Sequence, residues 1–349
     1  MATAKNSAID MLRRERTART LAPEVRSLLE RENDLSTGPS DQLRMMFSCC
    51  HPRLHEEAQV ALVLHILCGF SVGEISSAFL SSEAAVKKRI TRAKKVLAHS
   101  KRLFELTDTD FAVRLSAVHR ALYLLFNEGY HGASPESAIR AEPCREAVHL
   151  AGLLRDHPLT STPATYALLA LMCLHAARLP GRIDDAGELT MLVDQDRSRW
   201  DSALLAEGTR LLDLSATGTE LSEYHIEAAI ASVHAEARRP EDTAWETIVS
   251  LYDMLMAIRP SPVVALGRAL AIAEARGPDR GLEAVHAIAD PDRLAGYPFY
   301  SAALGELALR SGKPEVARAH LRTALSLARS PAERRLIERR LTACGQSGP

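Results

Sequence analysis

The sequence of 349 residues lacks several features that define common protein classes. Its longest apolar runs, near residues 60–68 and 166–174, are about half the length of a membrane span. Asp10 and Glu15 interrupt the start of the chain, so no secretory signal peptide is expected. The six cysteines show no disulfide-framework spacing and lie mostly in apolar patterns. These absences predict a cytoplasmic protein with no membrane attachment.

Patterns of β-structure and of catalysis are also missing. No segment alternates apolar and polar residues as a strand does, whereas helical periods recur along the chain. No nucleophile accompanied by a base is recognisable, and no glycine-rich phosphate loop is present. We therefore expect an all-α protein that is not an enzyme and that needs no cofactor and no metal.

No carboxylate lies between Val86 and Arg102, a segment with eight cations. Residues 103–349, by contrast, contain 26 basic and 33 acidic residues. A strongly basic helix fits the DNA major groove, with its first side chains near base edges and later ones at phosphates. The alternative is a solvated basic face, which the helix-turn-helix context described next disfavours. The residues expected to contact DNA are Ser82, Glu83, Ala85, Lys87, Lys88, Arg89, Thr91, Arg92, Lys94 and Lys95.

Around this segment the sequence predicts two helices joined by a short turn. Ser71 and Glu74 have the Ser-x-x-Glu spacing of a capping box, so the first helix should begin at Ser71. The chain then turns near residues 80–81, and Ser82 is a suitable N-cap for the second helix. This pattern is typical of a helix-turn-helix motif. The apolar stripe expected to face the core consists of Val86, Ile90, Ala93 and Leu97.

Composition divides the chain into four segments. Residues 1–20 predict the end of a helix, residues 21–40 a linker, residues 41–102 a four-helix domain and residues 105–345 a helical-hairpin array. In the last segment, small residues recur at the spacing of the tetratricopeptide repeat, which allows two antiparallel helices to approach closely. Such arrays usually bind partners, so this segment predicts a regulatory or interaction domain. The residues with this spacing are Leu304, Gly305, Ala308, Ala317, Leu321 and Ala324.

Three groups of polar residues have more than one interpretation. Cys49, Cys50 and His51 suggest zinc, but adjacent cysteines point to different faces of a helix, which favours a packed core. Asp184 with Asp185, and Asp194 with Asp196, could be paired carboxylates, but their polar loop setting and the adjacent Arg197 and Arg199 favour a surface ion network. The third group is interpreted either as contacts between helices or as a groove for a partner, and it consists of Asn127, Glu128, Tyr130, Arg197, Arg199 and Trp200.

The chain resembles bacterial sigma factors of the extracytoplasmic-function (ECF) group, in the subfamily with a C-terminal tetratricopeptide-like extension. Residues 41–100 are similar to sigma region 4, including the sequence Phe-Ser-Cys-Cys-His-Pro at residues 47–52. Residues 123–130 (Tyr-Leu-Leu-Phe-Asn-Glu-Gly-Tyr) and 194–201 (Asp-Gln-Asp-Arg-Ser-Arg-Trp-Asp) resemble motifs of the extension. Residues 4–14 resemble the last helix of sigma region 2, and the residues expected to represent that region are Asn6, Asp10, Arg13 and Arg14.

The resemblance implies a protein that directs RNA polymerase to promoters by binding the −35 element through region 4. Its expected partners are promoter DNA, core RNA polymerase and a regulatory protein on the C-terminal domain. Two alternatives stay open: a free-standing helix-turn-helix regulator, and a truncated sigma relic with an interaction scaffold. Binding to core polymerase distinguishes the sigma factor from the free-standing regulator.

The sequence departs from the family pattern at two places. Family members have a full region 2, which opens the −10 element, before the helix at Ala4, whereas here Met1 lies within the end of that region. We therefore expect either a start codon assigned too far downstream or a truncated chain, and no promoter opening by this chain alone. The second departure is Ser81, which replaces an apolar residue and is expected to loosen the turn slightly.

Overall fold

The computed structural model describes residues 41–79, 81–99, 106–131, 141–185, 188–328 and 330–346. The expectations for residues 1–40, including the region 2 residues Asn6, Asp10, Arg13 and Arg14, lie outside this part of the chain. The α-helices are α2 (Asp41–Cys49), α3 (Glu56–Ile66), α4 (Val72–Ala78), α5 (Glu83–Ala98), α6 (Asp108–His131), α7 (Ala141–Asp156), α8 (Pro163–Ala176), α9 (Ser202–Ser215), α10 (Glu223–Glu236), α11 (Trp245–Ile258), α12 (Pro262–Arg276), α13 (Pro278–His286), α14 (Pro298–Arg310), α15 (Pro314–Leu327) and α16 (Pro331–Gln346).

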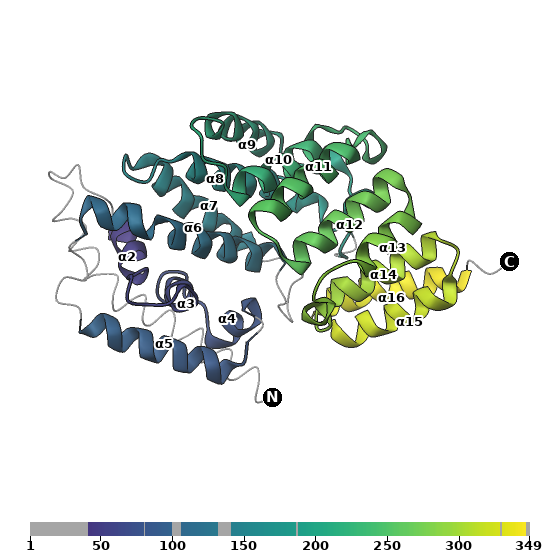
Figure 1. The fold of residues 1–349 in the computed structure, drawn as a ribbon, viewed down its shortest axis with the longest axis horizontal. Coiled ribbons are helices and arrows are strands. Elements are labelled where there is room, and N and C mark those ends of the chain that lie inside the picture. Colours follow the sequence, from purple (N-terminus) through teal and green to yellow (C-terminus); the bar gives the residue numbers. More distant parts are fainter. Residues whose placement is uncertain are drawn as a thin grey trace. The chain divides into compact units, whose positions relative to one another are not determined.

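Helices dominate the described residues, which confirms the predicted all-α class (Figure 1). The one strand-like feature within them is a single antiparallel bridge between Ile183 and Leu189. This bridge lies in the connection between α8 and α9, which also contains three short 3₁₀ turns, η1 (Leu179–Gly181), η2 (Leu192–Asp194) and η3 (Arg197–Arg199). None of the described helices has both the length and the apolar character needed to cross a membrane.

Local sequence explains where many of the helices begin. Thr162 and Ser261 accept hydrogen bonds from the backbone N–H groups three residues later, at 3.3 and 3.1 Å, and so cap α8 and α12. A proline at the first helical position has its φ angle already fixed near the helical value and has no N–H group to leave unsatisfied. The helices that begin in this way start at Pro163, Pro262, Pro278, Pro298, Pro314 and Pro331.

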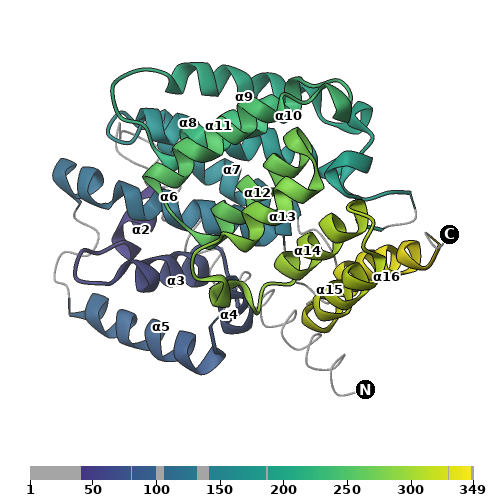
Figure 2. The ribbon, with the colours of Figure 1, turned by 45° about the vertical axis from the view of Figure 1, so that its right-hand side comes forward.

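Successive helices in the C-terminal part form antiparallel hairpins, of which α14 and α15 are one (Figures 1 and 2). A β-carbon added to Gly305 of α14 would lie 2.7 Å from Cγ of Leu321 on α15, so the hairpin requires glycine there. Ala308, Ala317 and Ala324 are buried in the same cluster as Leu321. The small-residue spacing therefore does bring two helices close together, while the likeness to the tetratricopeptide repeat stays a prediction.

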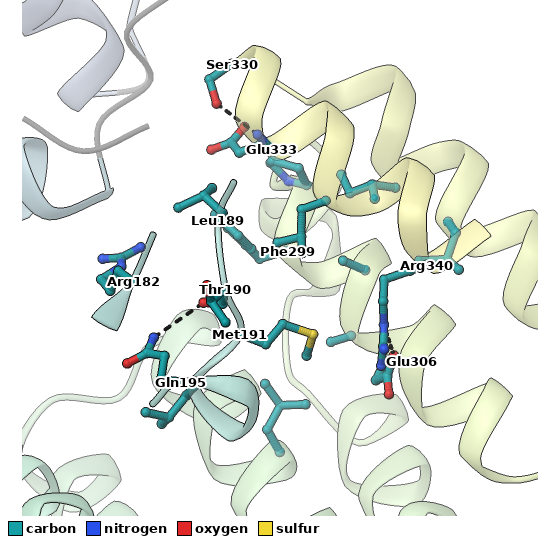
Figure 3. A pocket seen from close by; sticks show the side chains of 18 of the residues that line it. Arg182, Leu189, Thr190, Met191, Gln195, Phe299, Glu306, Ser330, Glu333 and Arg340 are labelled. Carbon is teal, nitrogen blue, oxygen red and sulfur yellow. Dashed lines mark hydrogen bonds and ion pairs between the residues drawn. The ribbon is translucent and has the colours of Figure 1, made fainter. Parts of the chain in front are cut away.

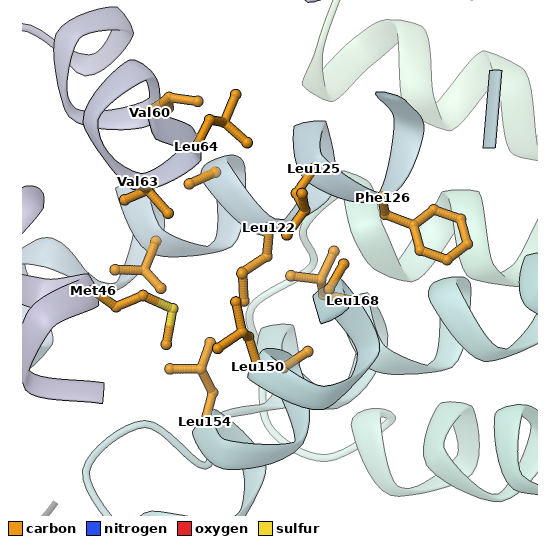
Figure 4. Packing of buried hydrophobic residues seen from close by; sticks show 14 of the residues in the cluster. Met46, Val60, Val63, Leu64, Leu122, Leu125, Phe126, Leu150, Leu154 and Leu168 are labelled. Carbon is orange, nitrogen blue, oxygen red and sulfur yellow. The ribbon is translucent and has the colours of Figure 1, made fainter. Parts of the chain in front are cut away.

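The largest hydrophobic core runs from α2 to α10. Met46 of α2 and Leu64 of α3 belong to the same buried cluster as Leu122 of α6 and Leu150 of α7 (Figure 4). α3 contacts both α5 and α6, and it lies between them in both views (Figures 1 and 2). The four-helix segment predicted at residues 41–102 is therefore packed, through α3, directly on α6, the first helix of the extension.

A buried polar contact joins the same two segments. Arg114 of α6 donates a hydrogen bond from its guanidinium to the carbonyl oxygen of Phe47, at 3.1 Å, and also pairs with Asp110. The ring of Phe111 lies 4.6 Å from that of Phe47. Residues from Gln42 onward form one compact unit. The expected division at residues 102–105 stays a prediction, and the core continues from one side of it to the other.

Candidate nucleic-acid interface

A capping box starts the first helix of the predicted helix-turn-helix. The backbone N–H of Ser71 donates to the Glu74 carboxylate at 2.7 Å, and the backbone N–H of Glu74 donates to the Ser71 hydroxyl at 3.2 Å. The two residues satisfy each other's free backbone donors, which fixes the start of α4. The predicted capping box is confirmed.

The connection to the second helix is short and held by hydrogen bonds. The backbone N–H of Ser81 donates to the carbonyl of Ser76 at 2.9 Å. The Ser82 hydroxyl then accepts from the backbone N–H of Ala85 at 3.3 Å, which confirms Ser82 as the N-cap of α5. Glu83 lies in the first turn of α5, where a carboxylate interacts favourably with the helix dipole.

The apolar stripe of α5 is buried as predicted. Its buried residues are Val86, Ile90, Ala93 and Leu97, and α5 packs through this side against α3 and α4. Every residue of the remaining surface is exposed or half-buried. The buried stripe fixes the rotation of the helix about its own axis, and thereby determines which side chains face solvent.

Five cations on α5 are exposed to solvent, and the sixth, Arg89, is half-buried. No ion pair with a carboxylate is formed by any of the five in the part of the chain that the structure describes. Arg89 is different, because its guanidinium lies 2.6 Å from the carboxylate of Glu57 on α3 and 5.8 Å from the centre of the Phe79 ring. The five exposed cations are Lys87, Lys88, Arg92, Lys94 and Lys95.

The uncharged residues predicted to contact DNA also lie on the exposed part of α5. Ser82 and Ala85 are exposed at its N-terminal end, beside the exposed carboxylate of Glu83. Thr91 is exposed one turn further on, and its hydroxyl donates to the carbonyl of Lys87 at 2.8 Å. Of the ten predicted contact residues, nine are therefore exposed on α5 or at its N-cap. The tenth, Arg89, is half-buried and forms an ion pair with Glu57 of α3.

The two cysteines considered for a zinc site are buried in the core. Cys49 and Cys50 are 3% and 1% exposed. Burial raises the pKa of the Cys49 thiol to about 12, and it also raises the pKa of Cys50. Neutral thiols in this setting behave as small apolar side chains, as the packed-core interpretation predicted.

In the extension, Arg197 forms contacts between two helical elements. Arg197 donates to the carbonyls of His234, at 2.8 Å, and Ala237, and so joins η3 to the end of α10. Its guanidinium also lies 5.1 Å from the centre of the buried Trp200 ring. Asn127 forms a hydrogen bond with the side chain of Tyr123, and Glu128 beside it is half-buried. These positions favour the inter-helix interpretation for Arg197 and Trp200.

The acidic residues near η3 form local surface contacts. The Asp196 carboxylate accepts a hydrogen bond from the backbone N–H of Ser198 at 2.9 Å and caps η3. Arg199 donates to the exposed carboxylate of Asp185 at 3.2 Å. Asp194 is exposed at the end of η2. The surface-network interpretation therefore holds for the Arg199 pair, while Asp196 acts as a helix cap.

Tyr130 has a different position from the other predicted residues. Its ring is buried at the end of α6, and the Arg182 guanidinium lies over it, 4.0 Å from its centre. Tyr130 also lines a cavity bounded by the C-terminal hairpins. For Tyr130, the groove interpretation is supported by this cavity.

Comparison with known proteins agrees with this geometry. The family model for sigma-70 region 4 matches residues 44–97, and that of a family of unknown function, DUF6596, matches residues 114–216. Over 347 residues the chain is 38% identical to the uncharacterized protein R00370 of Rhizobium meliloti (strain 1021), covering 97% of this chain and 81% of that protein. The chain belongs to the family of R00370. No solved structure matches it.

The region 4 match contains α3, α4 and nearly all of α5. It supports a sigma-factor-like protein that binds DNA. The second match begins at Arg114, the residue that donates to Phe47 across the shared core, and ends just after α9.

Proposed function

We propose that this chain is a sigma factor of the ECF type that directs RNA polymerase to promoters. The observation that carries the proposal is the surface of α5 within the region 4 segment. Five cations without carboxylate partners among the described residues lie there, opposite a buried stripe that fixes the helix on α3 and α4. A rigid helix with this charge distribution fits the major groove of the −35 element.

The arrangement suggests a division of roles along α5. Ser82, Glu83 and Ala85 lie at the N-terminal end, which in a helix-turn-helix enters the groove and approaches base edges. The cations from Lys87 to Lys95 extend along the next three turns, where contacts to phosphates would set the register. Arg89 would act indirectly, because its ion pair with Glu57 holds α5 on α3.

For residues 105–345 we propose a regulatory and interaction domain of the tetratricopeptide-like type, without catalytic activity. Its acidic balance makes it a poor second surface for DNA. Its direct packing on α3 means that a protein bound to the extension would be mechanically connected to the DNA-binding helices. With promoter DNA and core polymerase as partners, the site of action would be the cytoplasm.

The competing function is a free-standing DNA-binding regulator, which would need no polymerase. The test is gel filtration of the purified full chain mixed with core RNA polymerase. A sigma factor should elute with the polymerase in a stable complex, whereas a free-standing regulator should bind duplex DNA and elute separately. The variant with Lys87, Lys88 and Arg92 all changed to Ala is the matched control, since it should lose DNA binding and keep polymerase binding.

A further inference from the structure

A cavity of about 390 Å³ lies between the connection that follows α8 and the C-terminal hairpins. Its volume falls within the range of about 300–1,000 Å³ that is usual for sites of small molecules. The middle is apolar, with Leu189, Met191 and Phe299 close together (Figure 3). Arg182 and Gln195 lie on one side of the cavity, and the ion pair between Arg340 and Glu306 lies on the opposite side (Figure 3).

Arg178, which follows α8, lines this cavity with a charge that has no partner among the described residues. Its side chain is only 7% exposed. Within the described residues its guanidinium forms no ion pair and donates no hydrogen bond, and its Nε atom is fully buried. Its guanidinium lies 5.4 Å from the centre of the Trp200 ring. Because burial of an unpaired charge is costly, such a side chain requires an explanation.

A second guanidinium adds to the positive charge on this side of the cavity. Arg182 donates to the carbonyl of Tyr130 at 2.7 Å and forms no ion pair with a carboxylate among the described residues. Burial lowers the pKa of Arg178, and the nearby charge of Arg182 lowers it further. Glu306 is already paired with Arg340, and neither it nor Glu333 is within ion-pair distance of the two arginines. Among the described residues, this side of the cavity therefore carries two positive charges without a counterion.

Two further polar atoms of the cavity lining are buried and have no hydrogen-bond partner in the described part of the chain. The Gln195 amide donates to the carbonyl of Thr190 at 3.3 Å, which leaves its Oε1 atom unsatisfied. The Thr190 hydroxyl is also buried and unsatisfied. Buried polar groups nearly always have a hydrogen-bond partner, so these atoms, together with Arg178, indicate a ligand that supplies the partners.

We propose that this cavity binds a small organic anion with an apolar body. The acidic group, a carboxylate or a phosphate, would lie on Arg178 and Arg182 and accept a hydrogen bond from the Thr190 hydroxyl. The apolar body would lie against Met191, Phe299 and Ile337. The extension would then be the receptor for a metabolite, and this inference does not depend on whether α5 binds DNA.

The test uses the full chain and four probes with the same ten-carbon tail: decanoate, decyl phosphate, decanol and decylamine. Binding is measured by isothermal titration calorimetry. Decanoate or decyl phosphate should bind one-to-one and at least tenfold more tightly than decanol, and decylamine should not bind. The preferred acid then identifies the headgroup. Equal affinity for decanol and the two acids, or no binding of either acid, would overturn the proposal.

Two variants separate a binding role of Arg178 from a structural one. Arg178→Met should lose at least tenfold in affinity for the acid, while the free protein should melt at the same or a higher temperature because the unpaired charge is gone. Arg310→Met is the matched control, since it removes an arginine that pairs with Glu274 outside the cavity, and it should not change acid binding. If Arg178→Met does not fold, Arg182→Met must show the loss of affinity. A lower melting temperature with unchanged acid affinity would assign Arg178 a structural role instead.

Discussion

The exposed cations of α5 should determine the salt dependence of DNA binding, and Arg89 should not. The informative variant changes Lys87, Lys88 and Arg92 to Ala together. All three side chains are exposed and unpaired within the described residues, so their removal should leave the melting temperature unchanged. If each contacts a phosphate, the slope of log K against log salt concentration should fall in magnitude by about 2 to 3.

The triple variant should also lose affinity for DNA. At about 0.1 M salt each lost phosphate contact costs about tenfold, so the triple variant should bind at least about 100-fold more weakly. Fluorescence anisotropy of a labelled duplex, titrated with the full chain at several salt concentrations, measures both quantities.

The control changes Arg89 and Glu57 to Ala together, which removes one charge of each sign. This pair lies 2.6 Å apart on the protein, and a surface ion pair of this kind contributes at most about 1 kcal/mol to stability. Its loss should change the salt slope by less than about 0.5. Equal slopes for the triple variant and the wild type, or a larger effect of the control, would refute the assignment of α5 as the DNA-binding surface.

Three further predictions concern the fold of the extension and its core. Burial raises the pKa of the Glu227 carboxyl to about 7. The contribution of Glu227 to the stability of the fold is therefore full below about pH 4.5 and is lost as the pH rises through 7. Glu227→Gln should raise the melting temperature at pH 8 and leave it nearly unchanged at pH 4.5. Leu122→Ala should cost about 2–5 kcal/mol in urea unfolding, and the loss of helix and of DNA binding should coincide because the core is continuous; two separate transitions would contradict this. Gly305→Ala should cost about 1–3 kcal/mol because of Leu321, whereas Gly152→Ala, with open space around it, should cost nothing.

The sequence predicted α5 well because all of the information needed is local. The period of Val86, Ile90, Ala93 and Leu97 specifies the buried side, and the cap at Ser82 specifies the start. The sequence groups Arg89 with the DNA contacts because its ion-pair partner, Glu57, belongs to a different helix. A pairing between side chains 32 residues apart depends on how α3 packs against α5, which no local pattern encodes.

The sequence contains a signal that the core continues across the division predicted at residues 102–105. Every residue of α3 from Ala58 to Leu64 is buried, and all of them except Gln59 are apolar, so apolar side chains lie around most of the circumference of this helix. A helix of this kind must be covered on all sides, and α4 and α5 cover only part of it. Arg178 gave no such signal, because nothing in the sequence distinguishes an arginine that ends up buried from one on the surface.

The most direct test of the central claim is selection of DNA fragments from a genomic library by the full chain in complex with core RNA polymerase. The account predicts that one short sequence motif is enriched, and that the variant with Lys87, Lys88 and Arg92 changed to Ala loses this enrichment while still binding polymerase. If the variant enriches the same motif as strongly as the wild type, α5 does not recognise the DNA and the proposed function is wrong.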